Sequence, residues 1–306
     1  MGRERVRATL LILTLSLMSN PETLPDFDKL WDYNEPAATE EKFRGLLPRA
    51  EAAGDASYRA QLLTQIARAQ GLQRKFAEAH ATLDQVGQVD QPLPRVRYLL
   101  ERGRVFNSSG KPAQARPLFE QALEMASQNK LDNYAVDAAH MMAIVEPDPR
   151  KQLEWNLRAM DLAERSTDER ARRWRASLYN NIGWTCFDQK DYDRAMEVFE
   201  KAVALRRQQD QPRELRVARY CVAKTLRMQG KLDDAIAIDR QIIEEAQAAN
   251  EPDGYLFEEL AECLHAQGKT DDAQPYFRRA YEELSKDLWL AEREPQRLER
   301  LKQLGS

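Results

Sequence analysis

The sequence has few of the residues from which catalytic and metal sites are built. Its 306 residues include three cysteines and three histidines. The histidines, His80, His140 and His265, are isolated, and Cys263 and His265 would point to different sides of a helix. Phosphate-loop, dinucleotide-binding, HExxH, CxxC and nucleophile-elbow motifs are all absent from the sequence. The sequence therefore predicts no enzyme, no metal site and no cofactor.

Cysteine usage and charge exclude further classes of protein. Cys186, Cys221 and Cys263 are odd in number and widely spaced, which does not indicate a disulfide framework. With 46 basic and 50 acidic residues the net charge is −4, whereas a nucleic-acid-binding domain is normally basic along one face. We therefore expect no nucleic-acid partner.

Long apolar runs and strand-like patterns are also missing. No run of about 18 apolar residues is present, so no transmembrane span of the usual kind is predicted. Charged residues make up 31% of the chain, with only 12 glycines and 14 prolines, as in a soluble helical protein. No segment alternates apolar and polar residues with period two, so we expect almost no β-strand.

The sequence does contain a repeated pair of helices, which is clearest at residues 176–204. Apolar and small residues recur there at helical spacing, first as Tyr179, Ile182, Gly183 and Cys186, then as Tyr192, Ala195, Phe199 and Ala202. The break between the two helices falls at residues 189–191. Small residues stand where two helices must approach closely, and bulky ones fill the space beside them.

The same pattern recurs on both sides of this pair. One small position, which opens the second helix of each pair, recurs as Ala79, Ala115, Gln152 (in a degenerate unit), Ala195, Ala235 and Ala273. This helix–turn–helix alternation of large and small residues resembles the tetratricopeptide repeat (TPR) family. The steps exceed the usual ~34 residues, as in long-repeat TPR arrays of bacterial regulators.

The resemblance implies an all-α, right-handed superhelical solenoid of about seven helix pairs. We expect an imperfect first pair at residues 19–55, in which Pro48 kinks or interrupts a helix. The TPR array would follow at 56–287, and a C-terminal capping helix with one apolar stripe at 288–306.

Residues 1–18 allow two interpretations. Three arginines followed by a short apolar run have the outline of a signal peptide, but the cleavage site is poor. Alternatively, translation begins at Met18 and the first 17 residues are an upstream extension. The unpaired cysteines favour a cytoplasmic location, with export as the alternative.

In TPR proteins the first helices of the pairs line a concave groove, and the resemblance carries this groove onto specific positions here. Aromatic groups at these positions would pack on a partner, while arginines and lysines would contact its acidic groups. Asparagine amides would hold a peptide backbone. The predicted partner-binding residues are Arg68, Arg104, Asn107, Asn180, Trp184, Tyr220, Lys224, Arg227, Tyr255 and Glu258.

Structural roles compete with binding roles at several of these positions. Trp184 and Phe187 could instead pack within the array, and Lys224 and Arg227 could belong to a solvated face. Glu258 and Glu262, four residues apart, are expected on a solvated face rather than at a catalytic site. His140 is expected to be partly buried with its hydrogen bonds satisfied.

The sequence thus predicts a non-enzymatic scaffold or adaptor that binds an unidentified protein or peptide. One alternative is an exported or membrane-tethered assembly factor that uses residues 1–18 as a signal or anchor. Another is a self-associating structural protein.

Overall fold

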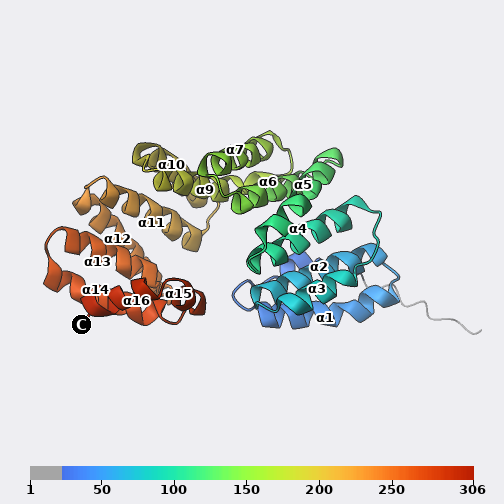
Figure 1. Cartoon of the computed structure of the whole chain (residues 1–306), viewed down its shortest axis with the longest axis horizontal. Coiled ribbons are helices and arrows are strands. Elements are labelled where there is room, and N and C mark those ends of the chain that lie inside the picture. The colour runs from blue at the N-terminus through green and yellow to red at the C-terminus, as the bar shows by residue number, and fades with distance from the viewer. Residues whose placement is uncertain (1–22) are drawn as a thin grey trace, which may run out of the picture. The chain divides into compact units, whose positions relative to one another are not determined.

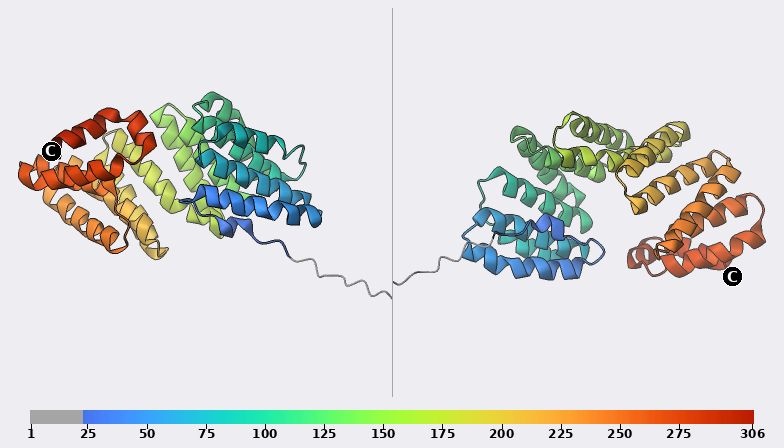
Figure 2. Two further views of the ribbon diagram at one scale, coloured as in Figure 1. Left: turned by 90° about the horizontal axis from the view of Figure 1, so that it is seen from below. Right: turned by 180° about the vertical axis from the view of Figure 1, so that it is seen from behind.

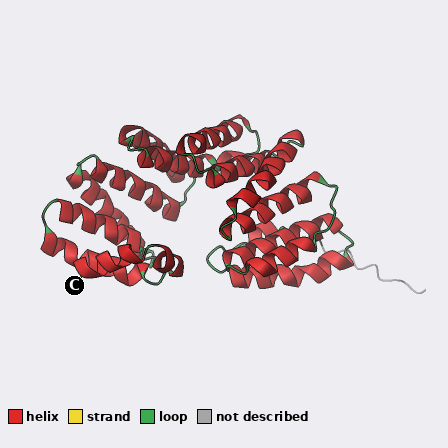
Figure 3. Cartoon of the chain, viewed as in Figure 1, coloured by secondary structure: helices red, strands yellow, loops and turns green. Residues whose placement is uncertain are grey.

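The computed structural model describes residues 23–306, and over this range the chain is all-α. Figure 3 shows helices joined by short loops, with no strand in the described part of the chain. The predicted all-α fold is confirmed. The signal-like segment, residues 1–18, lies outside the described residues. None of the helices within residues 23–306 has the length and hydropathy needed to cross a membrane.

The chain divides into two compact units after Gly87. Unit 1 contains a 3-10 helix and three α-helices, with the bounds Phe27–Leu30 (η1), Pro36–Ala52 (α1), Ala56–Leu72 (α2) and Phe76–Asp84 (α3). Helix α2 packs on both α1 and α3. The described part of the predicted imperfect pair at 19–55 therefore contains η1 and one α-helix.

Unit 2 contains helices α4 to α16 (Figure 1). Its helix pairs are α4–α5 (Pro92–Ser108, Pro112–Gln128), α6–α7 (Asp132–Val145, Pro149–Arg165), α9–α10 (Arg175–Asp188, Tyr192–Gln208), α11–α12 (Pro212–Met228, Leu232–Ala248) and α13–α14 (Gly254–Ala266, Thr270–Leu284). From α4 to α14 each helix packs on the next one along the chain. Figure 2 shows the helices nearest the C-terminus at one end of this unit and α4 at the other.

Close approach within a pair depends on the predicted alternation of small and large residues. A Cβ atom added to Gly183 would lie 2.4 Å from Cε1 of Phe199, and Gly103 bears the same relation to Phe119. Both phenylalanines are fully buried. The ring of the second helix therefore occupies the space that a side chain on the first helix would need.

Four of the five pairs in unit 2 have a residue in the left-handed region just after the first helix, and only the α6–α7 turn lacks one. Gly230 is this residue after α11, with φ at 78°, and Lys190 is this residue after α9, with φ at 64°. Left-handed residues of this kind end many helices because they let the last carbonyl groups find hydrogen-bond donors. After Lys190, for example, Asp191 N donates to the carbonyl oxygen of Cys186.

Helix α8 (Glu169–Arg173) is an addition that the pair pattern did not predict. It lies between α7 and α9 and contacts α6, α7 and α9. Ala171 anchors it, since that side chain is fully buried. The insertion accounts for the long step from Gln152 to Ala195 in the repeat spacing.

Pro48 does not interrupt α1, so that part of the prediction was wrong. The helix runs continuously from Pro36 to Ala52. Phe43, Leu46 and Ala50 on either side of the proline are buried. Their packing offsets the roughly 3 kcal/mol that proline costs a helix interior.

The C-terminal segment forms α15 (Leu288–Arg293) and α16 (Pro295–Leu304). Helix α16 packs on α14, with Leu298 and Leu301 buried beneath it. It begins at Pro295, and these two leucines form the buried part of the predicted apolar stripe.

Candidate functional site

The predicted groove residues of unit 2 lie on the first helices α4, α9, α11 and α13. The same positions of the repeat fall on Tyr134, Met141 and Ile144 of α6 and on Val217 of α11. We call the part of this face formed by Ile144, Asn180, Trp184, Val217, Tyr220 and Lys224 the first-helix surface. Hydrogen bonds connect its helices in order: Asn181 of α9 reaches His140 of α6, and Cys221 of α11 reaches Asn180 of α9.

Trp184 is half-buried and packs mainly on its own helix pair. Its ring meets Phe187 edge-on at a centroid distance of 5.1 Å and Phe199 at 5.5 Å. Phe187 in turn meets Tyr192 at 5.3 Å. Trp184 and Phe187 therefore pack within the array, and the tryptophan ring also lies beside Lys224 of α11.

Lys224 of α11 connects Trp184 to Tyr220. Its Nζ lies 5.9 Å from the Trp184 ring centroid and 5.5 Å from that of Tyr220, and it donates to Tyr220 Oη over 3.1 Å. Burial, followed by the negative charges of Glu259 and Glu258, raises the pKa of Tyr220 well above its ordinary value. Tyr220 is therefore a neutral hydroxyl whose oxygen accepts a hydrogen bond from the ammonium group of Lys224.

Glu259 on α13 is a residue that the sequence analysis missed. It is 1% exposed and accepts from both Nε and Nη2 of Arg227, while Lys224 Nζ lies 3.8 Å from its Oε2. Burial by itself would lower the pKa of Arg227. The hydrogen bonds to Glu259 and the negative charge of Glu259 outweigh that effect, so the pKa is raised. Lys224 and Arg227 therefore do not belong to a solvated face, since both compensate the charge of the buried Glu259 carboxylate.

Asn180 retains amide hydrogens that a ligand could use. Its Oδ1 accepts from Cys221 Sγ at 3.3 Å, and burial raises the pKa of that thiol to about 12. Within residues 23–306 the Asn180 amide nitrogen donates no hydrogen bond. Asn107 of α4, also half-buried, makes no side-chain hydrogen bond to that part of the chain.

The other predicted cations already have partners. Arg104 contacts Glu101, 2.7 Å away, and Asp137 of α6. Arg68 belongs to unit 1, where its guanidinium lies 5.7 Å from the Tyr33 ring centroid. The sequence grouped Arg68 with the other residues, whereas the structure describes it only within its own unit.

Helix α16 covers the predicted residues of α13. Arg297 donates through Nε and Nη2 to both carboxylate oxygens of Glu258, and its guanidinium lies 5.3 Å from the Tyr255 ring centroid. Arg300 forms the matching pair with Glu262. The expectation that Glu258 and Glu262 lie on a solvated face was wrong, because the C-terminal helix pairs with both.

Two apolar residues at groove positions remain open. Ile144 of α6 is 49% exposed and Val217 of α11 is 47% exposed. Other apolar groove positions of α6, Tyr134 and Met141, are buried instead. The first-helix surface thus keeps an exposed apolar side chain on α6 and another on α11, with the unused amide of Asn180 on α9.

His140 behaves as predicted. Its Nδ1 lies 3.1 Å from Nδ2 of Asn181, and its ring packs near Trp174. Burial lowers its pKa, so the ring is neutral. No cluster of three potential metal ligands occurs among the residues that the structure describes.

One sequence signal could have found the paired residues. Opposite charges stand about one repeat apart: Arg227 and Glu259 differ by 32 positions and Arg104 and Asp137 by 33. These separations are four to six residues shorter than the repeat steps from Ala115 to Gln152 and from Ala235 to Ala273, so the two residues of a pair are not at equivalent positions. They meet across the boundary between adjacent first helices.

Known families and structures agree with this architecture. Tetratricopeptide repeat family models match residues 176–209, 64–130 and 256–288. No curated protein matches the chain by sequence.

Three solved structures illustrate the likeness. BtubC from P. vanneervenii has a TM-score of 0.55 at 17% identity, over 74% of this chain and 93% of that one. The STAND protein with a tetratricopeptide repeat sensor from Pyrococcus horikoshii has a TM-score of 0.64 at 15% identity, over 90% of this chain but only 44% of that one. A Rap protein complexed with competence and sporulation factor has a TM-score of 0.54 at 16% identity, over 89% and 98%. Identities this low show the fold alone.

Proposed function

We propose that this chain, which is a tetratricopeptide repeat protein, is a non-enzymatic scaffold that binds a segment of a partner protein on its first-helix surface. Repeats of this kind serve protein interaction in general. The observation that carries the proposal is the exposure of Ile144 on α6 and Val217 on α11, the first helices that flank α9 with its unused Asn180 amide.

A partner that covers the exposed apolar side chains of the first helices would remove apolar surface from water, which favours binding. Because each side chain is already about half-buried, covering the rest would contribute roughly half of the ~1.5–3 kcal/mol that burial of a whole apolar side chain provides. Asn180 lies on α9, between the helices that carry Ile144 and Val217. Its amide hydrogens suit the carbonyl groups of an extended peptide.

Charge has a smaller part in this proposal than the sequence suggested. Lys224 and Arg227 compensate Glu259, and Arg104 compensates Glu101 and Asp137. A partner carboxylate would have to compete with these internal partners. We therefore propose that apolar and amide contacts hold the partner segment on the first-helix surface. The aromatic rings of Trp184 and Tyr220 lie at the edge of this contact area.

The Rap protein with the same fold was solved together with competence and sporulation factor. That complex supports the proposal only in showing that such a fold can hold a second molecule. Partner identity does not transfer at this level of sequence identity.

The test uses variants that leave the internal ion pairs intact. Full-length protein, an Ile144→Lys/Val217→Lys variant and a Leu157→Lys/Leu288→Lys control would each serve as bait for affinity capture with mass spectrometry. Leu157 and Leu288 are also exposed but lie on a second helix and on α15. All three proteins should have the same circular-dichroism melting curve.

We expect a partner that the wild type and the control retain and the Ile144/Val217 variant loses. Equal retention by both variants would refute binding at the first-helix surface. Recovery of only the chain itself, with a dimer mass in light scattering, would favour the self-associating alternative instead.

A further inference from the structure

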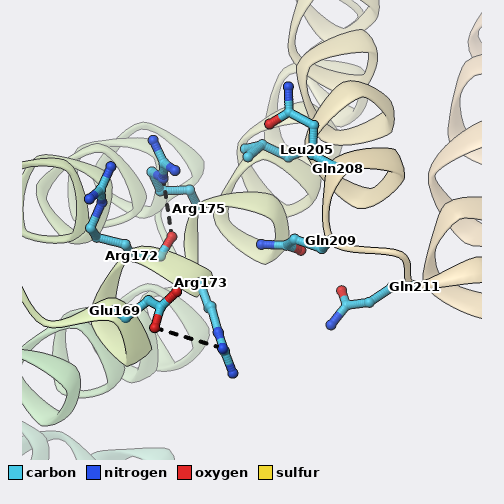
Figure 4. Close-up of a pocket in the computed structure, with 8 residues that line it drawn as sticks. All are labelled: Glu169, Arg172, Arg173, Arg175, Leu205, Gln208, Gln209 and Gln211. Carbon is cyan, nitrogen blue, oxygen red and sulfur yellow. Dashed lines mark hydrogen bonds and ion pairs between the residues drawn. The ribbon is translucent and has the colours of Figure 1, made fainter.

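A polar cavity lies beside α8, outside the first-helix surface (Figure 4). Its volume is about 530 Å³, and its walls come from α8, the start of α9, and the end of α10 with the connection to α11. Arg172, Arg173 and Arg175 line one side, and Gln209 and Gln211 line the other. The helix that supplies two of these arginines is the insertion that interrupts the repeat pattern.

Positive charge in this cavity is poorly compensated, in contrast to the first-helix surface. Arg173 lies 4.0 Å from Glu169, and both side chains are mostly exposed. Arg175 Nε donates to the carbonyl oxygen of Arg172, at 3.1 Å. Within residues 23–306 neither Arg172 nor Arg175 forms an ion pair. The three arginines that line the cavity therefore have only one carboxylate, that of Glu169, among the lining residues, and it is paired loosely with Arg173 alone.

A fourth arginine orients the two glutamines. Arg206 Nη1 donates to Gln209 Oε1 at 3.4 Å and also to Gln211 Oε1, while its Nη2 donates to Ser177 Oγ at 2.8 Å. Because the amide oxygens are used in this way, the amide nitrogens point toward the arginine side (Figure 4). Both walls thus present hydrogen-bond donors, and a ligand that fits them must supply acceptors.

We propose that this cavity binds the carboxylate groups of an acidic peptide segment. Arginine forks match carboxylates in a two-bond geometry, and glutamine amides can donate to a peptide backbone. The volume falls within the ~300–1,000 Å³ of ligand sites and exceeds the needs of one inorganic ion. None of the lining residues is aromatic, so a nucleotide base would find no stacking partner there.

This inference rests on the proposed function in one respect, because it assumes that the ligand belongs to a protein. The two sites use different residues and different chemistry. The first-helix surface is apolar with its charges compensated, whereas the cavity is cationic. Substitutions in one therefore test it without disturbing the other.

The experiment measures fluorescence anisotropy of a fluorescein-labelled hexaglutamate peptide titrated with the full chain. The test variant is Arg172→Gln/Arg173→Gln/Arg175→Gln. Its matched control is Arg150→Gln/Arg240→Gln/Arg293→Gln, which removes the same charge at exposed positions elsewhere. A second variant, Gln209→Glu/Gln211→Glu, keeps the acceptors for Arg206 and replaces the inward amide groups by carboxylate oxygens, so it preserves local packing.

We expect both cavity variants to bind hexaglutamate about tenfold or more weakly. The arginine variant removes charge-assisted hydrogen bonds, and the glutamine variant removes amide donors and adds negative charge beside an acidic peptide. The control should stay within about twofold at 0.15 M salt, where distant charges are screened. Labelled hexaglutamine should not bind. The Ile144→Lys/Val217→Lys variant should bind hexaglutamate as the wild type does, whatever it does to partner capture.

Several results would overturn the proposal. Equal weakening in the exposed-arginine control would mean non-specific attraction by net charge. Displacement of the labelled peptide by inorganic phosphate or pyrophosphate at lower concentration than by unlabelled hexaglutamate would make the ligand a phosphate. Unchanged affinity in Gln209→Glu/Gln211→Glu would place the peptide elsewhere, even if the arginine variant failed to fold.

Discussion

Arg227 on α11 donates two hydrogen bonds to the buried carboxylate of Glu259 on α13, and the one from Nη2 to Oε2 is 3.1 Å long. The pair joins the first helices of two adjacent repeats. Two of the predicted groove residues, Arg227 and Lys224, therefore hold the array together. For this reason their substitution is a test of stability before it is a test of binding.

Arg227→Ala should destabilise the chain strongly. Among the residues that the structure describes, it leaves the buried Glu259 with Lys224, 3.8 Å away, as its one remaining charge partner. Removing one member of a buried ion pair costs about 3–5 kcal/mol of unfolding free energy, and the low end applies because Arg227 is partly exposed. Urea unfolding followed by circular dichroism measures the loss.

Two companion variants sharpen this prediction. Arg240→Ala, at an exposed position of α12, should change the unfolding free energy by less than about 0.5 kcal/mol. Arg227→Met/Glu259→Met should lose less than Arg227→Ala, because neither charge is left unpaired. If Arg227→Ala were as stable as the wild type, that result would contradict the structural role of the Arg227–Glu259 pair.

Asp239 on α12 should make stability depend on pH. It is fully buried, and its Oδ1 has no hydrogen-bond partner in the described part of the chain. Burial, followed by the charge of Glu259, raises its pKa well above the ordinary value. Above about pH 4 the unfolded chain loses this proton while the native chain keeps it. The contribution to stability is thus full below about pH 4 and is lost as the pH rises toward the native pKa.

Asp239→Asn removes the ionisation and keeps an oxygen for Cys263 Sγ, which lies 3.7 Å from Oδ2. We expect this variant to exceed the wild type in unfolding free energy at pH 7, with the difference shrinking toward pH 4. Urea unfolding at pH 4, 5, 6 and 7 tests this. Asp272→Asn, at an exposed site, should show no such trend. A gain that does not vary with pH would argue against a protonated Asp239.

Gly183→Ala should be destabilising although alanine is the better helix former. The added Cβ would lie 2.4 Å from Cε1 of Phe199. Overpacking of this kind costs roughly 1–3 kcal/mol. Gly45→Ala is the matched control, since a Cβ there meets nothing within 4 Å in the interior of α1. That control should gain about 0.5–1 kcal/mol from helix propensity. The prediction is confirmed if Gly183→Ala lowers the melting temperature and Gly45→Ala raises it. A higher melting temperature for Gly183→Ala would refute it.

Helix α16 should depend on its apolar stripe more than on its ion pairs. Leu301 is 0% exposed, and Leu301→Ala should cost about 2–5 kcal/mol. Arg300 is half-exposed beside Glu262, so Arg300→Ala should cost at most about 1 kcal/mol. Hydrogen exchange should report faster exchange throughout α16 in the leucine variant only. If Arg300→Ala destabilised the protein more than Leu301→Ala, the ion pairs rather than the apolar stripe would keep α16 docked on α14.

Much of the fold followed from local pattern. Ala115, Ala195, Ala235 and Ala273 recur where two helices must touch, and all four are fully buried. Packing of Gly183 against Phe199 is likewise a short-range contact within one helix pair. Such contacts are visible in sequence because the helix period sets which residues share a face.

The candidate site was less predictable, as Glu259 and α8 show. Glu259 stands next to the predicted Glu258, and a rotation of one residue on α13 decides that one is buried under Arg227 while the other meets Arg297. Helix α8 is too short for a periodic signal, yet it brings its arginines opposite Gln209 and Gln211.

The sequence by itself determined that this chain is an array of helix pairs, because each pair repeats the same small and large residues at the same helical spacing. Only the tertiary structure decided which side chains of the first helices remain open. Arg227, Arg104 and Glu258 find their partners on another helix, about a repeat length away in the chain. The side chains that meet across a repeat boundary depend on how one pair stacks on the next, which no local pattern of residues specifies.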